Sequence, residues 1–151
     1  VFPVGRLDRD SEGLLILTSD GELAYRLTHP RFEVAKRYVV HVRGEMDETA
    51  AGRLRTGVFV EGRKTAPAKV EVFERSGRGS VLQIEIHEGR KHEVRNMCEA
   101  VGHPVVSLKR VMFAGLSLSH LPAGHHRPLT GAEILRLKKA AKIKIGRHNT
   151  N

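Results

Sequence analysis

The alternation of apolar and polar positions predicts that much of the regular structure in this chain is strand. Residues 35–44 and 81–87 alternate in steps of two, which is typical of strands with one buried and one wet face. Residues 13–18 form an unbroken apolar run, which predicts a short strand buried on both faces. Residues 105–118 also have the composition of a strand. Shorter apolar stretches predict further strands at residues 1–4, 57–60 and 66–73.

Four segments carry helical signatures instead. Ser19 and Glu22 have the spacing of a capping box, which predicts a helix from there to about Thr28. Thr130 and Glu133 repeat this spacing before a final helix. The other two predicted helices cover residues 47–54 and 90–101. Because strands outnumber helices and do not alternate strictly with them, the pattern favours the α+β class, with a mixed, mostly antiparallel sheet and a few flanking helices.

Composition limits the partners more than the fold. The length of 151 residues favours one domain. A net charge of +9 and a pI of about 10.2 favour a polyanionic partner such as nucleic acid, although many basic proteins bind none. Residues 134–151 hold six Lys or Arg and no acidic residue, so we expect a basic tail over 138–151. A single cysteine, Cys98, and the lack of a bilayer-length apolar stretch favour a soluble, cytoplasmic protein with no membrane partner.

The sequence GRLDRDSEGLLILTSDG places Asp8, Asp10 and Glu12 close together near the start of this basic chain. Like charges at this spacing repel each other, so the loop needs a reason to hold them. Three interpretations are open: a cation-binding loop, a solvated turn, or one carboxylate that takes part in chemistry. Arg6 and Arg9 flank Asp8 and favour its ionised form.

The cation-binding loop is the weakest of these interpretations. A calcium loop needs oxygen ligands at its first, third and fifth positions, which the chain has, and a glutamate at its twelfth, where the chain has Ser19. The neighbouring His125 and His126 have no cysteine or acidic partner at zinc-site spacing. We therefore expect no metal site. The residues alone favour a turn over a chemical carboxylate.

Four blocks of sequence resemble one enzyme family. They are GRLDRDSEGLLILTSDGEL, AKRYVVHVRG, HEGRKHEVRNMCEAVGHPVVSLKRVMFAGLSL and LPAGHHRPLTGAE, in this order and within residues 1–137. They resemble the bacterial ribosomal-RNA pseudouridine synthases, in the branch that contains the small-subunit enzyme and several large-subunit enzymes. The resemblance implies an α+β fold around a central RNA-binding cleft. It also implies a reaction in which a uracil is detached at N1, rotated and rejoined through C5.

The resemblance assigns catalytic roles to three residues. It makes Asp8 the essential carboxylate, which stabilises or traps the positive charge that glycosidic cleavage builds on the sugar. Tyr38 matches a tyrosine that stacks on the target uracil. Arg95 matches an arginine that pairs with the catalytic carboxylate. The plainer alternatives are a core aromatic for Tyr38 and a solvated helix charge for Arg95.

A second group of residues is expected to hold RNA. Arg6 matches a position that can fill the space left when the target base leaves its stack. Lys36 belongs to a motif of a basic residue two positions before the tyrosine. The other expected contacts are interpreted as phosphate ligands and are Arg90, Lys91, His92, Lys109 and Arg110. For His92, a local hydrogen-bonding role is equally open.

For the whole chain, the resemblance implies a cofactor-free isomerase of ribosomal RNA, with large-subunit RNA favoured, and we expect a monomer. Family members carry a small N-terminal RNA-binding domain, so residues 1–151 are expected to be a catalytic domain without it. The chain has Glu93 and Asn96 where the family often has a glutamine and an arginine, which bears on RNA binding. The alternative is a non-catalytic RNA-binding or ribosome-assembly module on the same fold.

Overall fold

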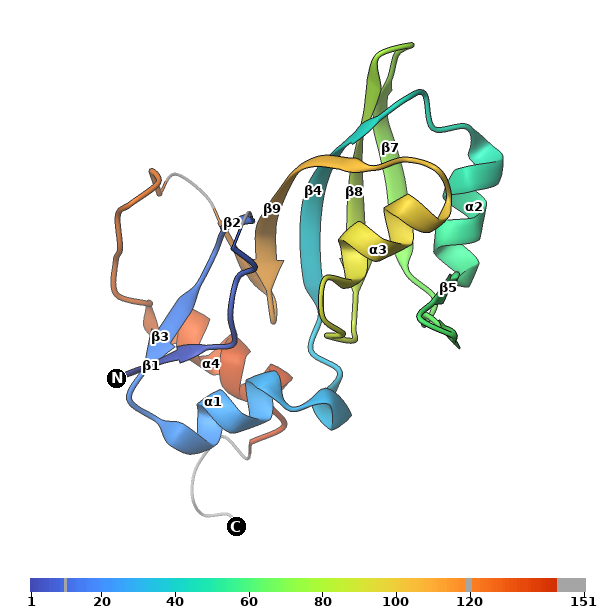
Figure 1. Cartoon of the computed structure of the whole chain (residues 1–151). Coiled ribbons are helices and arrows are strands. Elements are labelled where there is room, and N and C mark those ends of the chain that lie inside the picture. Colours follow the sequence, from blue (N-terminus) through green and yellow to red (C-terminus); the bar gives the residue numbers. More distant parts are fainter. Residues whose placement is uncertain (10, 119–120, 144–151) are drawn as a thin grey trace.

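The computed structural model describes every residue except 10, 119–120 and 144–151 (Figure 1). Its helices are α1 (Gly21–Thr28), α2 (Glu48–Thr56), α3 (Glu93–Ala100) and α4 (Gly131–Ala140), with a 3-10 turn at Pro30–Phe32. Its strands are β1 (Phe2–Val4), β2 (Glu12–Gly13), β3 (Ile16–Thr18), β4 (Lys36–Arg43), β5 (Phe59–Val60), β6 (Arg63–Lys64), β7 (Lys69–Arg75), β8 (Gly79–Ile86), β9 (Val105–Phe113) and β10 (Leu116–Ser117). The predicted α+β class is confirmed.

A six-stranded sheet organises the larger half of the molecule. Its main path runs β10-β9-β4-β8-β7, with antiparallel neighbours throughout, and β2 adds to β9 in parallel. β4 is the central strand, because it pairs along nearly its whole length with β8 on one side and with β9 on the other. The sheet is mixed and mostly antiparallel, as predicted.

Alternation along β4 and β8 decides which face of this sheet is buried. Val40 lies opposite Leu82, and both are fully buried in a core that α2 and α3 complete from the same side. Apolar burial of this kind is the main favourable contribution to folding. The other face is polar, and Arg37 forms an ion pair with Glu85 across the two strands at 3.0 Å. The prediction of one wet face is therefore confirmed.

A smaller second half contains β1, β3, α1 and α4. β1 and β3 pair as a separate two-stranded antiparallel sheet, and Figure 1 shows α1 and α4 beside it. The buried apolar cluster of this half also contains Phe113, Ala114 and Leu116, which come from the end of β9, the following turn and β10. The β9–β10 hairpin therefore extends from the large sheet into the second core and connects the two halves.

A close backbone contact fixes the start of the chain to β9. Gly13 has a φ of +119°, and a Cβ atom at this position would collide with the carbonyl oxygen of Arg110. The N–H of Leu14 donates to that same carbonyl at 2.9 Å. In return, the Arg110 guanidinium donates from Nε and Nη2 to the Leu14 carbonyl, at 3.0 and 2.8 Å. This reciprocal contact holds the preceding loop, residues 5–11, next to the sheet.

The apolar run at residues 13–18 does not form the predicted strand buried on both faces. It is divided between β2 and β3, which belong to different sheets. Ile16 is buried, whereas Leu17 is 57% exposed, because only one face of the β1–β3 pair packs on the second core. A continuous apolar run does not distinguish a doubly buried strand from two short, half-buried ones.

Three other boundaries differ from the sequence predictions. The helix predicted from residue 90 begins at Glu93, because the residues before it form a turn in which His92 has a φ of 53°. The strand predicted for 105–118 is the β9–β10 hairpin, which turns at Ala114 and Gly115 with positive φ. The predicted basic tail starts inside α4, and residues 144–151 lie outside the described part of the chain.

Helix capping was predicted correctly at one end of the chain and wrongly at the other. Thr130 and Glu133 form a complete capping box at the start of α4. The first helix is capped by Asp20 instead of Ser19, because the Asp20 carboxylate accepts from the N–H of Leu23 at 3.1 Å. Two adjacent residues with capping side chains gave the sequence two possible registers, and the structure uses the second.

We expect Gly13→Ala to lower the free energy of unfolding by about 2 kcal/mol or more, because its methyl group meets the β9 backbone at a φ that L-residues avoid. Gly52→Ala is the matched control. Gly52 lies inside α2 with open space around its Cα, so alanine should stabilise the helix there by about 0.5–1 kcal/mol. Urea unfolding measures both variants. Wild-type stability for Gly13→Ala would show that the contact with β9 is loose.

Candidate functional site

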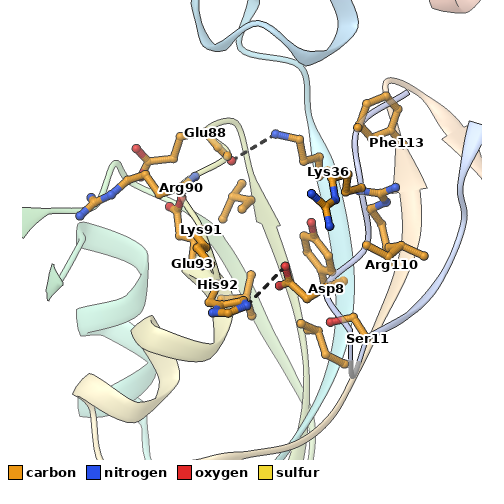
Figure 2. Close-up of a pocket in the computed structure, with 18 of the residues that line it drawn as sticks. Asp8, Ser11, Lys36, Glu88, Arg90, Lys91, His92, Glu93, Arg110 and Phe113 are labelled. Carbon is orange, nitrogen blue, oxygen red and sulfur yellow. Dashed lines mark hydrogen bonds and ion pairs between the residues drawn. The ribbon is translucent and has the colours of Figure 1, made fainter. Parts of the chain in front are cut away.

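Three walls enclose a cavity of about 740 Å³ at one end of the main sheet (Figure 2). The first wall is formed by residues 5–9 and 11, and the second is formed by β4, β8 and β9. The third is the segment of residues 88–94, which connects β8 to α3. Lys36 and Tyr38 reach the cavity because they continue the inward face of β4 beyond Val40.

Asp8 extends into the cavity from the first wall. The N–H of Ser11 donates to the Asp8 carbonyl at 2.9 Å, so the chain turns directly after this residue. The Asp8 side chain is 34% exposed, and its Oδ1 lies 3.6 Å from Nε2 of His92 in the third wall. Figure 2 shows these two side chains pointing toward each other. The loop is therefore a turn that also presents a carboxylate to the cavity.

Tyr38 and Arg110 face each other on neighbouring strands of the second wall. They are register partners on β4 and β9, and the Arg110 guanidinium acts on the pKa of the Tyr38 phenol. Burial raises the pKa of Tyr38, although the positive charge of Arg110 opposes the change. The phenol consequently keeps its proton at neutral pH. Tyr38 offers the cavity an aromatic ring and a hydroxyl donor, and it also packs against the main core.

Arg110 is a structural part of the cavity wall. Its side chain is only 4% exposed, its guanidinium lies 5.0 Å from the ring centre of Phe113, and two of its N–H groups bond the Leu14 carbonyl. A buried charge is tolerated when it is hydrogen-bonded in this way. The burial of Arg110 does not favour the predicted phosphate contact and instead indicates that it supports the first wall.

Lys36 connects the second wall to the third. Its Nζ donates to the carbonyl of Glu88 at 3.2 Å, and Gly89 leaves room for this approach, since a Cβ there would lie 3.0 Å from the same nitrogen. Burial lowers the pKa of Lys36, and the positive charge of Arg110 lowers it further. Part of the hydrogen-bonding capacity of the Lys36 ammonium group is thus used within the protein.

Hydrogen bonds between Arg90 and Glu93 organise the third wall. Oε1 of Glu93 accepts from the N–H of Arg90 at 3.0 Å, and the N–H of Glu93 donates to the Arg90 carbonyl at 3.1 Å. The Arg90 guanidinium donates to the carbonyl of Val60 on β5 at 2.8 Å. Much of its hydrogen-bonding capacity therefore faces the protein. His92 follows with a φ of 53°, in the left-handed region that few residues other than glycine adopt.

Glu93 and Glu88 form an unusual pair of carboxyl groups at this wall. Glu93 is 4% exposed. Burial raises the pKa of Glu93 to about 8, and a hydrogen bond to Glu88 adds to the change. For Glu88, burial tends to raise the pKa. Hydrogen bonds from Glu93 and from the Ala66 N–H outweigh this effect, so the pKa of Glu88 is lowered. At neutral pH the structure therefore holds Glu93 as the acid and Glu88 as the carboxylate.

The cavity brings together eight of the ten predicted site residues, namely Arg6, Asp8, Lys36, Tyr38, Arg90, Lys91, His92 and Arg110. The other two lie outside its lining. Arg95 is half-buried in α3, and Lys109 is exposed on the face of β9 opposite Arg110. The pairing of Arg95 with Asp8 and an RNA contact at Lys109 stay predictions.

Some residues of the lining were not among the predicted site residues, among them Ser11, Glu88, Glu93 and Phe113. A signal existed for Glu93, which lies four residues before the buried Met97 and so extends the apolar stripe of α3 by one turn. A glutamate at such a position is expected to be buried. Glu88 has no comparable pattern, because it follows the end of β8 and lies outside any helix or strand.

The arrangement defines what the cavity can do chemically. Asp8 supplies one carboxylate that can stabilise positive charge developing on a substrate, and Arg6 and Lys91 supply exposed cations that can hold an anionic one. In the described part of the chain, no three His, Cys, Asp or Glu side chains are grouped to hold a metal ion. Within the same residues, no helix combines the length and apolar character needed to cross a bilayer.

Comparison with known proteins places the chain in a family. The family model described as RNA pseudouridylate synthase matches residues 1–100, which include the first wall, β4 and the third wall of the cavity. The chain belongs to the RNA pseudouridylate synthase family. The predicted family is thereby confirmed.

Two relatives show how far the similarity extends. Ribosomal large subunit pseudouridine synthase B of Bacillus subtilis (strain 168) is 44% identical over 143 residues, which are 93% of this chain and 59% of the relative. An uncharacterized RNA pseudouridine synthase of Aquifex aeolicus (strain VF5) is 42% identical over 144 residues, which are 95% of this chain and 58% of the relative. The chain thus spans less than two-thirds of the length of both relatives.

Solved structures support the same family. A crystal structure described as a pseudouridylate synthase matches 89% of this chain and 58% of its own, with a TM-score of 0.83 and 35% identity. Human RNA Pseudouridylate Synthase Domain Containing 1 matches 95% of this chain and 80% of its own, with a TM-score of 0.59 and 19% identity. At this low identity, the second match shows the fold alone.

We expect Arg110→Lys to lower the free energy of unfolding by about 2 kcal/mol, because an ammonium group cannot reproduce the two-pronged contact and leaves the Leu14 carbonyl poorly bonded. Lys109→Arg is the control, since it changes the neighbouring exposed residue and should stay within about 0.5 kcal/mol of wild type. Urea unfolding compares them. Equal stability of the two variants would contradict the structural role of Arg110.

Proposed function

We propose that this chain isomerises a specific uridine of ribosomal RNA to pseudouridine, with Asp8 as the reacting carboxylate. The observation that carries the proposal is the position of Asp8 where the three walls meet, 34% exposed and 3.6 Å from His92. Membership of the pseudouridylate synthase family supports the reaction class. The name of the Bacillus subtilis relative supports large-subunit RNA as the substrate.

The reaction needs one carboxylate at the sugar. Breaking the bond between N1 and C1′ builds positive charge on the ribose, which Asp8 can stabilise or trap covalently. The detached uracil rotates and forms a bond from C5 to C1′. The hydrogen on C5 is then released as a proton, and N1 gains one. No water enters the product and no group leaves it, so the reaction is an isomerisation.

Tyr38 is proposed to hold the uracil during this rotation. A base within a helix or a stacked loop must be extruded before a protein group can reach its glycosidic bond. An aromatic ring then replaces part of the lost stacking, at about 1–3 kcal/mol per base. Because burial keeps the phenol protonated, the hydroxyl can donate a hydrogen bond to the base or the sugar. It is a poor proton acceptor at neutral pH.

Exposed cations around the cavity are proposed to hold the phosphates of the RNA. Arg6 and Lys91 are exposed and line opposite walls, so they can contact the backbone on either side of an extruded base. Such contacts supply affinity but little sequence choice. Lys36 and Arg90 contribute charge while their polar groups also bond the protein.

The proposal extends to the setting of the reaction. The isomerisation as written uses only side chains and the RNA itself, so we propose that it runs without a cofactor, and we propose a monomer. An enzyme of ribosomal RNA acts where ribosomes are assembled, which in a bacterium is the cytoplasm.

We expect Asp8→Asn to abolish isomerisation and to leave RNA affinity within a few-fold of wild type, because asparagine keeps the shape of the side chain and removes its charge. The measurement is tritium release from large- and small-subunit ribosomal RNA labelled at uracil C5. Asp47→Asn is the matched control, because Asp47 caps α2 away from the cavity and asparagine caps helices equally well.

Two results would contradict the proposal. Release by Asp8→Asn at the wild-type rate would remove Asp8 from the chemistry. No release by folded, RNA-bound wild type from either RNA would favour the alternative, a binding module on the same fold.

We expect Lys91→Gln to weaken RNA binding and to reduce the slope of log affinity against log salt by about 1, because one phosphate contact is lost. Lys69→Gln makes the same charge change at an 81% exposed position on β7 and is the control. Filter binding over a range of salt concentrations measures both. An unchanged slope for Lys91→Gln would place this residue outside the RNA contact.

A further inference from the structure

The carboxyl pair in the third wall requires a proton. Glu88 and Glu93 both line the cavity, and each carboxyl shifts the pKa of the other in the way that a shared hydrogen bond does. Two ionised carboxylates have only acceptor atoms and cannot form such a bond, so one of them must carry a hydrogen. Oε2 of Glu93 is shielded from solvent, and in the described part of the chain no nitrogen or hydroxyl group bonds to it. Because this oxygen accepts no hydrogen bond from a donor in this part of the chain, it is the carboxyl oxygen best suited to carry the proton.

The other atoms of the pair are anchored to three different parts of the protein. Oε2 of Glu88 accepts from the N–H of Ala66, which precedes β7, at 2.7 Å. Oε1 of Glu93 accepts from the N–H of Arg90 at 3.0 Å. The carbonyl of Glu88 accepts from Nζ of Lys36 on β4 at 3.2 Å. The hydrogen bond between the two carboxyl groups therefore closes a set of contacts around residues 88–93.

We propose that Glu88 and Glu93 hold one proton between them, and that this shared proton fixes the third wall and keeps His92 beside Asp8. The inference rests on the proposed function, because its effect on catalysis acts through the surroundings of Asp8. Glu93 is thus a positioning residue. The left-handed backbone of His92 agrees with this role, since a sparsely populated conformation persists only where its neighbours hold it.

The charges around the pair decide when the proton is lost. Burial is the main cause that raises the pKa of Glu93 to about 8, and Glu88 adds to it, while the positive Arg90 favours ionisation. Lys36 and Tyr38 face Glu93 from β4, Arg63 acts on Glu88 from β6, and the exposed His92 is adjacent in the chain. Above that pH, two negative carboxylates would face each other without a hydrogen between them, and the wall would move.

The first test is the pH dependence of tritium release from C5-labelled ribosomal RNA. In wild type, kcat/KM should fall by about tenfold per pH unit above pH 8, because one ionisation disrupts the wall. In Glu93→Gln, the amide donates permanently to Glu88 and its oxygen still accepts from Arg90. This variant should keep wild-type activity at pH 7 and lose the alkaline fall. Glu93→Ala should lose at least tenfold at every pH.

Control variants separate the pair from other groups. Glu99→Gln makes the same change at an exposed position of α3 and should keep the wild-type profile. Lys36 is the second group whose pKa is shifted toward the alkaline range of the assay. Arginine does not titrate in that range, so the alkaline fall of kcat/KM should persist in Lys36→Arg, whatever the activity of this variant. Loss of the fall in Lys36→Arg, with its retention in Glu93→Gln, would assign the ionisation to Lys36 and overturn the proposal.

The second test does not depend on catalysis. Carbon-13 NMR of protein labelled at the glutamate carboxyl carbons should show one group titrating near pH 8 in wild type and not in Glu93→Gln. The ring signal of His92, assigned with His92→Gln, should shift over the same pH range in wild type only. If wild type releases no tritium at any pH but these titrations appear, the proposed function fails and the proton-sharing pair stands.

Thermal unfolding gives an independent check that the pKa of Glu93 is raised in the folded chain. A carboxyl whose pKa is higher in the folded than in the unfolded chain stabilises the fold at low pH and loses this contribution as pH rises to the folded value. Wild type should therefore lose stability relative to Glu93→Gln as the pH rises from about 4.5 to 8. Above pH 8 the difference in stability should stay constant. The proposal is overturned if Glu93→Gln has the same pH profiles as wild type, or is as inactive as Glu93→Ala at pH 7.

Discussion

The site depends on one contact, the exchange of hydrogen bonds between Leu14 and Arg110 across a glycine. Gly13 lets the start of the chain approach β9 so closely that no side chain fits between them. Arg110 then bonds the Leu14 carbonyl twice. A buried guanidinium without partners would be costly, so the requirement to satisfy Arg110 also determines where the loop that carries Asp8 must lie. The same arginine faces Tyr38, which ties the carboxylate and the aromatic ring to one support.

The electrostatics of the cavity follow from burial on one side and exposure on the other. Toward the protein interior, burial keeps the Tyr38 phenol and the Glu93 carboxyl in their neutral, protonated forms at neutral pH. Toward the solvent, Arg6 and Lys91 remain exposed cations. An anionic RNA strand is therefore attracted to the rim, while an extruded base would meet the neutral hydroxyl of Tyr38. Asp8 lies between these two environments, which suits a carboxylate that has to meet a developing positive charge on a sugar.

The sequence predicted the features that neighbouring residues determine and missed those that they do not. The alternating strands were predicted over 35–44 and 81–87, close to the observed 36–43 and 79–86, because each has one dry and one wet face. The cap at Thr130 was predicted because its partner Glu133 lies within one turn. The start of α3 was missed, because a left-handed turn at His92 precedes it and no local pattern of residues indicates that turn. Adjacent residues also proved ambiguous: alternation sends Lys109 to the solvent and Arg110 to the interior, and both had been interpreted as phosphate ligands.

Asp8, the proposed catalytic carboxylate, shows where local reasoning ended. The residues alone favour a solvated turn at Asp8 over a chemical role, and only the resemblance to a family points to chemistry. The structure adds the walls around Asp8, which no local pattern contains. The central claim is that this enclosed carboxylate isomerises uridine, and the most direct measurement is nucleoside analysis of large-subunit ribosomal RNA, transcribed without modification, after incubation with the chain. One pseudouridine per RNA molecule should appear, with an equal loss of uridine. Unchanged nucleoside content, with the RNA bound and the protein folded, would contradict this claim.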